Sequence, residues 1–183
     1  ASLFTAMGFF LVHSSDGYSA IEKPWQRAGE VANPALDEIS GLAQSQRDSA
    51  VYWAHNDSGS GAYLYAFDQQ GRDLAKITLS GVGNRDWEDL ASFTWQGKPW
   101  LLVGEVGDNE AHHAELRLHL VEEPALEAGV HDYTLKPTRS YPFVYPEGPR
   151  DCESIAVDME REEILILSKR DVPARLYRLP LDA

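Results

Sequence analysis

Short runs in which apolar and polar residues alternate cover most of the chain, and turns rich in Gly, Pro, Asn and Asp separate them. This alternation is typical of β-strands, because neighbouring side chains on a strand point to opposite faces of the sheet. Runs with the 3.6-residue period of an amphipathic helix are scarce, whereas Trp, Tyr and Phe are plentiful. The pattern therefore predicts an all-β fold of many short strands.

These strands belong to a repeat that is anchored on a Leu-Ala or Ile-Ala pair. The anchor occurs three times, as DEISGLA at 37–43, RDWEDLA at 85–91 and RDCESIA at 150–156. Aligning the three anchors produces two polar columns, two residues apart. The first column contains Glu38, Asp86 and Asp151, and the second contains Ser40, Glu88 and Glu153.

Further apolar runs follow each anchor in the same order. A second run ends in a polar cluster and occupies 50–57, 99–109 and 162–171, and a third occupies 62–68, 115–123 and 174–181. A fourth run is present in the first two repeats, at 73–79 and 131–145. Before the first of these, Asp68-Gln69-Gln70-Gly71 predicts a hairpin turn in which Gly71 has a positive φ. Four antiparallel strands per repeat are typical of β-propeller blades.

The repeats predict that residues 1–183 are a single β-propeller domain or a fragment of one. About three blades of four-stranded antiparallel sheet are expected, at 37–80, at 85–145 and, incomplete, at 150–183, after an N-terminal segment at 1–36. Within that segment, 24–31 stands where an outermost, ring-closing strand belongs. Because three blades do not close a ring, the remaining blades must come from a longer chain, which we favour, or from a second copy.

Charge and composition restrict the partners. The 183 residues carry a formal net charge of −13 and are 43% apolar, which is enough for the core of one domain. We expect no binding to nucleic acid or to an anionic membrane surface, because both require basic residues. The acidic charge is compatible with cation binding, although it also serves simply to keep a protein soluble.

Cys152 is the single cysteine, so no intrachain disulfide can form. It lies between two acidic residues, which disfavour a thiolate and argue against a catalytic thiol. The apolar stretch at 1–12 lacks the basic flank of a signal peptide and is too short to span a bilayer. This stretch slightly favours export, and we expect a periplasmic or secreted protein without a membrane span.

The two polar columns predict a cation site. Residues two apart on a strand share a face, so the paired columns are aimed together at the central channel of a propeller. Up to five carboxylates meet there, and like charges gathered in this way repel one another unless a cation neutralises them. Oxygen ligands alone select a hard ion, and we expect calcium.

Polar residues at the ends of the second runs extend this set. His55-Asn56-Asp57, Asp108-Asn109 and Lys169-Arg170-Asp171 occupy equivalent positions. Asn and Asp at strand ends are ordinarily turn formers, but their recurrence beside the carboxylate pairs also fits metal binding. The predicted metal ligands are Glu38, Asn56, Asp86, Glu88, Asp108, Asn109, Asp151 and Glu153.

Basic residues interrupt the acidic pattern. Lys169 and Arg170 are expected either to neutralise neighbouring acids or to meet an anionic ligand, and Arg85 and Arg150 are expected to be counter-ions of the acidic pairs. His112-His113 has no third ligand at metal spacing and is expected on a surface loop. No G-x-S-x-G sequence is present, so the common type of serine hydrolase is not supported.

The motifs EISGLA, YWAHNDSG, DWEDLA and GDN resemble those of an uncharacterised bacterial six-bladed β-propeller family. That family is related to the SdiA-regulated proteins and to the esterase-like domain named after phytase. More distantly, the layout over about 37–180 is similar to the gluconolactonase, paraoxonase and strictosidine synthase propellers. The resemblance implies a six-bladed ring, frequent export and calcium in the central channel. It implies ligands at Glu38, Asn56, Asp108 and Asn109, whereas the doubled carboxylates depart from the lactonase pattern.

These observations support two functions and a structural alternative. The first is a calcium-type binding module with a small-molecule or protein ligand at the channel face. The second is a metal-dependent hydrolase of an ester, lactone or phosphoester, in which the candidate catalytic residues are His55 and Glu88. In the third, the acids are merely structural and are paired with arginines.

Overall fold

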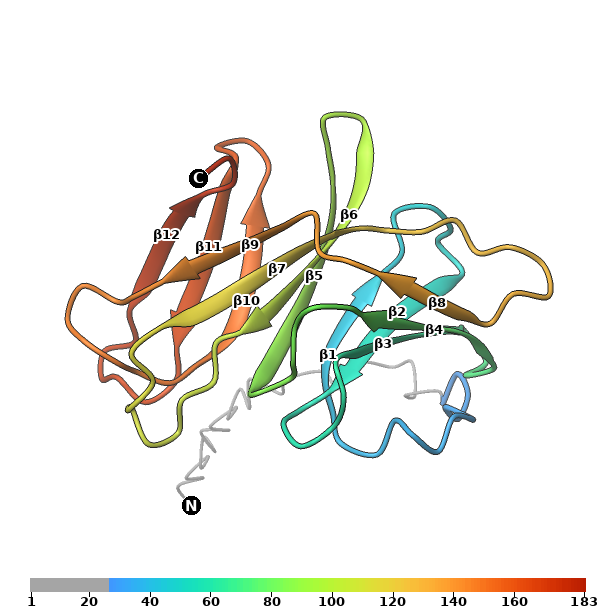
Figure 1. Cartoon of the computed structure of the whole chain (residues 1–183), viewed down its shortest axis with the longest axis horizontal. Coiled ribbons are helices and arrows are strands. Elements are labelled where there is room, and N and C mark those ends of the chain that lie inside the picture. The colour runs from blue at the N-terminus through green and yellow to red at the C-terminus, as the bar shows by residue number, and fades with distance from the viewer. Residues whose placement is uncertain (1–26) are drawn as a thin grey trace, which may run out of the picture.

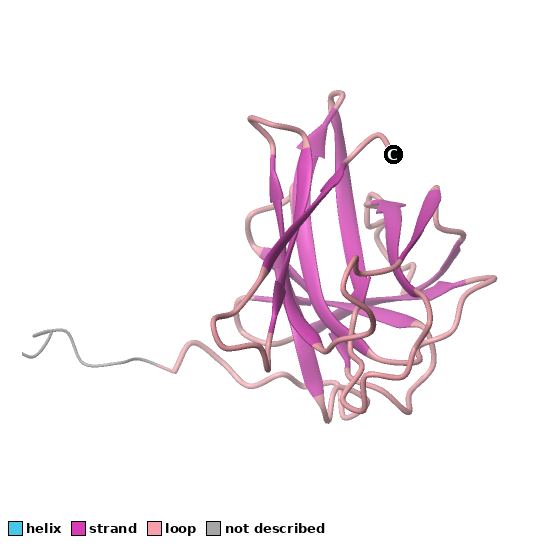
Figure 2. Ribbon diagram, turned by 90° about the vertical axis from the view of Figure 1, so that its left-hand side faces the viewer, coloured by secondary structure: helices cyan, strands magenta, loops and turns pink. Residues whose placement is uncertain are grey.

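The computed structural model describes residues 27–183, in which twelve β-strands and no helix are present (Figure 2). The predicted all-β class is thus confirmed. The apolar stretch at 1–12 and the start of the expected ring-closing strand at 24–31 lie outside the described residues, and residues 27–31 form no strand. Within the described part of the chain, no helix has the length and apolar character that crossing a membrane requires.

The strands form three sheets, which follow one another along the chain except that one later strand, at 132–135, joins the first sheet (Figure 1). The first sheet has the order β1-β2-β3-β4-β8 and contains β1 (Ile39–Gln44), β2 (Val51–Asn56), β3 (Tyr63–Asp68), β4 (Asp73–Leu79) and β8 (Asp132–Leu135). The second has the order β5-β6-β7-β9 and contains β5 (Trp87–Trp95), β6 (Lys98–Glu105), β7 (Leu116–Glu122) and β9 (Arg139–Phe143). The third contains, in this order, β10 (Cys152–Asp158), β11 (Glu163–Ser168) and β12 (Leu176–Pro180).

The three anchors form the first strand of each sheet, and the runs that follow form the next strands in antiparallel order, as predicted. The predicted turn after β3 is also confirmed. Gly71 has a φ of 82° and donates its N–H to the carbonyl oxygen of Asp68 at 2.8 Å. The left-handed conformation at this position favours glycine, because it has no Cβ.

The region 131–145 does not form one strand of the second sheet, so this prediction was wrong. Its first half, β8, adds to the outer edge of the first sheet and pairs parallel with β4, while only β9 joins the second sheet. The N–H of Lys76 donates to His131 O at 2.8 Å, and that of Ser80 donates to Leu135 O at 2.7 Å. Tyr133 and Leu135 pack against the core of the first sheet, which explains why their apolar side chains belong there.

The second sheet lies between the other two and buries both of its faces. On β6, Leu101 and Val103 pack into a core shared with the first sheet, whereas Trp100 and Leu102 pack into a core shared with the third. In a strand that is buried on both faces, apolar and polar residues need not alternate, and the sequence of β6 is accordingly apolar almost throughout. The three sheets do not close into a ring within residues 27–183.

The first strands β1, β5 and β10 lie next to one another. The hydroxyl of Ser40 donates to the carbonyl oxygen of Glu88 at 2.8 Å, which joins β1 to β5. The N–H of Ile155 donates to Asp89 Oδ2 at 2.8 Å, which joins β10 to β5. The stacking of the sheets therefore brings together the polar columns of all three anchors.

Candidate metal centre

Each of the three first strands carries a β-bulge at the same column of the repeat. The register shifts between Ile39 and Gly41 on β1, and the extra residue is Ser40. Equivalent shifts leave Glu88 as the extra residue on β5 and Glu153 on β10. Bulges redirect side chains and are frequent near functional sites. The sequence predicts simple alternation here, and nothing in it signals that the second polar column coincides with the bulges.

Five carboxylates gather at this end of the first strands. One oxygen from each of Asp57, Asp86 and Glu88 lies within 4.8 Å of the others, and the same holds for Glu88, Asp151 and Glu153. Glu88 is common to both groups. We refer to these five residues as the carboxylate cluster. Asp57 follows β2 and was absent from the predicted ligands, although it belongs to the His55-Asn56-Asp57 motif.

Gly107, in the loop after β6, approaches two of these side chains closely. A Cβ at this position would collide with Oδ2 of Asp86 and with Oε1 of Glu88. The close approach of both carboxylates to the backbone therefore depends on a residue without a side chain. Asp86 of the first polar column and Glu88 of the second therefore bring one oxygen each to the same side of Gly107.

The cluster is electrostatically strained. Glu88 is 7% exposed, and burial, together with the charges of its four carboxylate neighbours, raises its pKa from 4.5 to about 7. Burial also raises the pKa of Asp86, and the charges of Asp57 and Asp151 add to this, while His113 and Arg85 act in the opposite direction. Neither carboxyl group forms a salt bridge with a basic side chain of the described residues that would oppose this rise in pKa.

Basic side chains neutralise one half of the cluster. Lys169 pairs with Glu153, and Arg170 Nε lies 2.8 Å from Asp151 Oδ2, which confirms that these two residues neutralise neighbouring acids. In contrast, no salt bridge within residues 27–183 involves Asp57, Asp86 or Glu88. The three remaining carboxylates form the half of the cluster that no salt bridge of the described residues neutralises.

The predicted counter-ion role of Arg85 and Arg150 is wrong. Arg85 Nη2 lies 3.0 Å from Glu105 Oε1, and Arg150 forms hydrogen bonds of 2.8 and 2.9 Å with Asp171. Each arginine directly precedes the acidic residue it was expected to neutralise, and successive side chains point to opposite sides of an extended chain. Neither arginine therefore forms a salt bridge with the carboxylate cluster.

The other predicted ligands lie outside the cluster. Glu38 is exposed, and the side-chain amide of Asn56 donates to Ala35 O at 2.6 Å and to Asp37 Oδ1 at 3.0 Å, which fastens the loop before β1. Asn109 accepts a hydrogen bond from Arg170. Asp108 is 1% exposed, and it accepts hydrogen bonds of 2.9 Å from two backbone N–H groups of the following loop.

Asp108 also supplies the third group that His112 and His113 were predicted to lack. One ligand atom from each of the three residues lies within 4.8 Å of the others. The histidines are in a loop, as expected, and the His112 side chain is 59% exposed. Since both oxygens of Asp108 already hold the loop backbone, this group is the weaker of the possible metal sites.

His55 is completely buried and is not a member of the carboxylate groups. Its Nδ1 lies 2.9 Å from Asn56 O, and its ring meets the edge of the Trp87 ring with the centroids 5.5 Å apart. Burial lowers the pKa of His55, although backbone groups and nearby carboxylates act in the opposite direction. The neutral imidazole thus packs between the first and second sheets.

No known protein-family model matches the chain, and no curated protein matches it at a significant level. The family resemblance of the anchor motifs therefore stays a prediction. The chemistry of the site follows from its own residues, which are negatively charged oxygen ligands gathered at the ends of three sheets.

Proposed function

We propose that the three sheets are consecutive blades of a β-propeller and that the carboxylate cluster binds a hard divalent cation, such as calcium, near the axis. Two features support the propeller. The first strands of all three sheets lie side by side, and each sheet packs face to face on the next. Stacking of this kind around a shared set of inner strands is how propeller blades are arranged.

One observation carries the cation proposal. Asp57, Asp86 and Glu88 lie with oxygens within 4.8 Å of one another, and no salt bridge in the described residues neutralises them. Three ionised carboxylates at this separation repel strongly when partly buried, and a divalent cation converts the repulsion into attraction. Calcium accepts six to eight oxygen ligands in flexible geometry, so it suits carboxylates from separate strands and loops.

Three carboxylates leave most positions around a calcium ion for other oxygens. Water or an oxygen of a ligand would fill these positions, which favours a binding module in which the cation holds a small molecule or protein partner at the channel face. For the hydrolase, the only base other than a carboxylate was His55, which is fully buried and packed against Trp87. The burial of this histidine favours binding over hydrolysis.

Calcium titration tests the proposal. Binding to the folded state alone raises the free energy of unfolding by about 2.7 kcal/mol at a concentration 100 times the Kd. We expect calorimetric binding and a rise in the melting temperature of the wild type. We expect affinity to fall by at least about tenfold in Asp86→Asn and Glu88→Gln, because each removes a charged ligand. Glu160→Gln, an exposed residue in the turn at the other end of β10, is the control.

A cation site at this cluster is contradicted if neither calcium nor magnesium binds or shifts the melting temperature. It is also contradicted if calcium binds but Asp86→Asn and Glu88→Gln have the same affinity as Glu160→Gln. A propeller would then still be open to test by an experimental structure of a longer chain, since the sheet stacking does not depend on the cation.

A further inference from the structure

The two end sheets each leave one face uncovered. We call the face of a sheet toward the preceding sheet its leading face and the opposite one its trailing face. The trailing face of the first sheet packs on the leading face of the second, and the trailing face of the second packs on the leading face of the third. The leading face of the first sheet and the trailing face of the third therefore have no neighbouring sheet within residues 27–183.

The repeat indicates what the uncovered leading face is for. Leu42, Leu90 and Ile155 are equivalent residues of the three anchors. Leu90 and Ile155 are 4% and 8% exposed because each is packed against the preceding sheet, whereas Leu42 is 58% exposed. Exposure of one large apolar side chain is unremarkable by itself, but here the same position is buried in both other repeats.

The uncovered trailing face gives the same result independently. Counted along the strand ladders, Leu64, Leu118 and Leu176 are equivalent residues of the third strands. Leu64 and Leu118 are fully buried between sheets, whereas Leu176 is 54% exposed. Beside it on β11, Leu167 is 42% exposed. The leading face of the first sheet is thus apolar like the buried contacts, whereas the trailing face of the third sheet combines Leu167 and Leu176 with the ion pair of Arg178 and Glu163.

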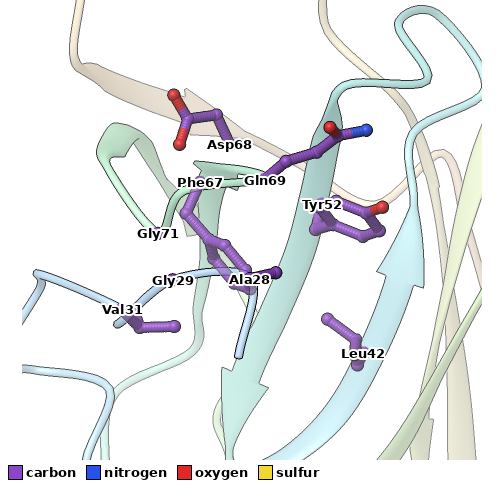
Figure 3. Close-up of a pocket in the computed structure, with 9 residues that line it drawn as sticks. All are labelled: Ala28, Gly29, Val31, Leu42, Tyr52, Phe67, Asp68, Gln69 and Gly71. Atoms are coloured by element: carbon purple, nitrogen blue, oxygen red, sulfur yellow. The ribbon is translucent and has the colours of Figure 1, made fainter. Parts of the chain in front are cut away.

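A groove on the first sheet marks where a partner would insert. It has a volume of ≈ 370 Å³ and lies between residues 28–31 and the leading face, where Leu42, Tyr52 and Phe67 line it (Figure 3). Tyr52 corresponds to Leu101 and Ile164, which are fully buried in the two existing contacts. The groove is therefore the uncovered part of a surface that the other repeats use for stacking.

We propose that the trailing face of the third sheet docks on the leading face of the first sheet of a second copy of this chain. The described sheets use only one type of contact, trailing face against leading face, and use it twice. Within residues 27–183 each copy has one unmatched face of each type, so a second copy supplies the matching partner for both. A symmetric contact between two leading faces would instead pair surfaces that never meet within the chain.

The mass of the 183-residue chain in solution tests this docking, by light scattering on a sizing column and by sedimentation. We expect the wild type to self-associate. Leu42→Lys and Leu176→Lys should each weaken association by at least about tenfold, because an unpaired charge is then buried in an apolar contact. Val144→Lys, at a residue 67% exposed next to β9 of the middle sheet, is the control and should associate like the wild type. Circular dichroism verifies that all three variants remain folded.

Mixing the two face variants distinguishes head-to-tail docking from a symmetric contact. In either variant alone, every contact contains one lysine, whereas a mixture allows the intact Leu42 face of one copy to meet the intact Leu176 face of the other. Association should therefore return on mixing through this one intact contact, although the other contact of a mixed pair contains both lysines. If the leading faces paired with each other, Leu176→Lys alone would associate normally, which would overturn the proposal.

A monomeric wild type at all soluble concentrations also overturns it, and is the result expected if a further sheet of a longer chain covers these faces instead. Self-association that neither face variant weakens overturns it too. The inference does not rest on the carboxylate cluster. Calcium affinity can be measured in the monomeric variants, so failure of the docking and failure of the cation site are separate results.

Discussion

Replacement of Glu88 by glutamine should make the calcium-free protein more stable. Glu88→Gln keeps the shape of the side chain and its contact with the Ser40 hydroxyl, but it removes a buried negative charge that lies among four other carboxylates. Its pKa is raised from 4.5 to about 7, and one pKa unit corresponds to about 1.4 kcal/mol. We therefore expect the variant to gain up to about 3 kcal/mol of unfolding free energy at a pH above 7.

The gain must depend on pH in a defined direction. The folded-state pKa of Glu88 lies above its unfolded value, so folding favours the protonated carboxyl group. The wild type consequently loses stability as the pH rises from about 4.5 to about 7, and the uncharged variant does not lose this contribution. The advantage of Glu88→Gln should be absent in acid and complete above pH 7.

Urea unfolding followed by tryptophan fluorescence measures both effects, first with a chelator and then with calcium. We expect Glu88→Gln to be more stable than the wild type without calcium and to have a much smaller response to calcium. Glu160→Gln should match the wild type in both conditions, because Glu160 is exposed and outside the cluster. If Glu88→Gln is less stable than the wild type without calcium at neutral pH, the cluster is not under repulsion, and the reasoning for a cation site fails.

Three other perturbations test separate parts of the structure. Glu123 is 1% exposed and accepts hydrogen bonds from Gln46 N and Trp53 Nε1. Glu123→Ala should lower the free energy of unfolding in urea by about 3–5 kcal/mol, because it leaves these buried donors without a partner. Glu122→Ala, at the neighbouring residue, should lower it by less than about 1 kcal/mol. Gly107→Ala should weaken calcium binding in calorimetry by at least about tenfold, because its Cβ would displace the carboxylates of the cluster. Hydrogen bonds to Asp73 and Asp132 raise the pKa of His131. The protonated His131 should therefore stabilise the folded state by about a few tenths of a kcal/mol at this exposed site. This stabilisation is present below about pH 6.5 and is lost as the pH rises through the folded-state pKa. His131→Gln should remove this pH dependence from urea unfolding, and an unchanged profile would contradict the assignment.

The sequence by itself determined the strands and most of their order. Period-two alternation and the turn at Asp68–Gly71 are local properties of the chain, because they depend on side chains and φ angles of residues a few positions apart. The three anchors were identifiable for the same reason, since each is a short segment with the same order of apolar and polar residues. Asp86, Glu88, Asp151 and Glu153 were accordingly predicted as neighbours, and one group of oxygens contains Glu88, Asp151 and Glu153.

Only the tertiary structure decided which groups each strand and side chain meets. The choice of β8 between two sheets depends on a hydrogen-bonding edge more than fifty residues away at β4, which no local pattern specifies. The bulges, the pairing of Arg85 with Glu105 and the use of the Asn56 amide by the loop before β1 likewise follow from which surfaces lie side by side after the sheets stack. A hydrogen bond or ion pair requires that its two groups lie within about 3 Å of each other. The residues of the site could therefore be predicted from the sequence, whereas the groups that each side chain contacts are determined by the packing of the sheets.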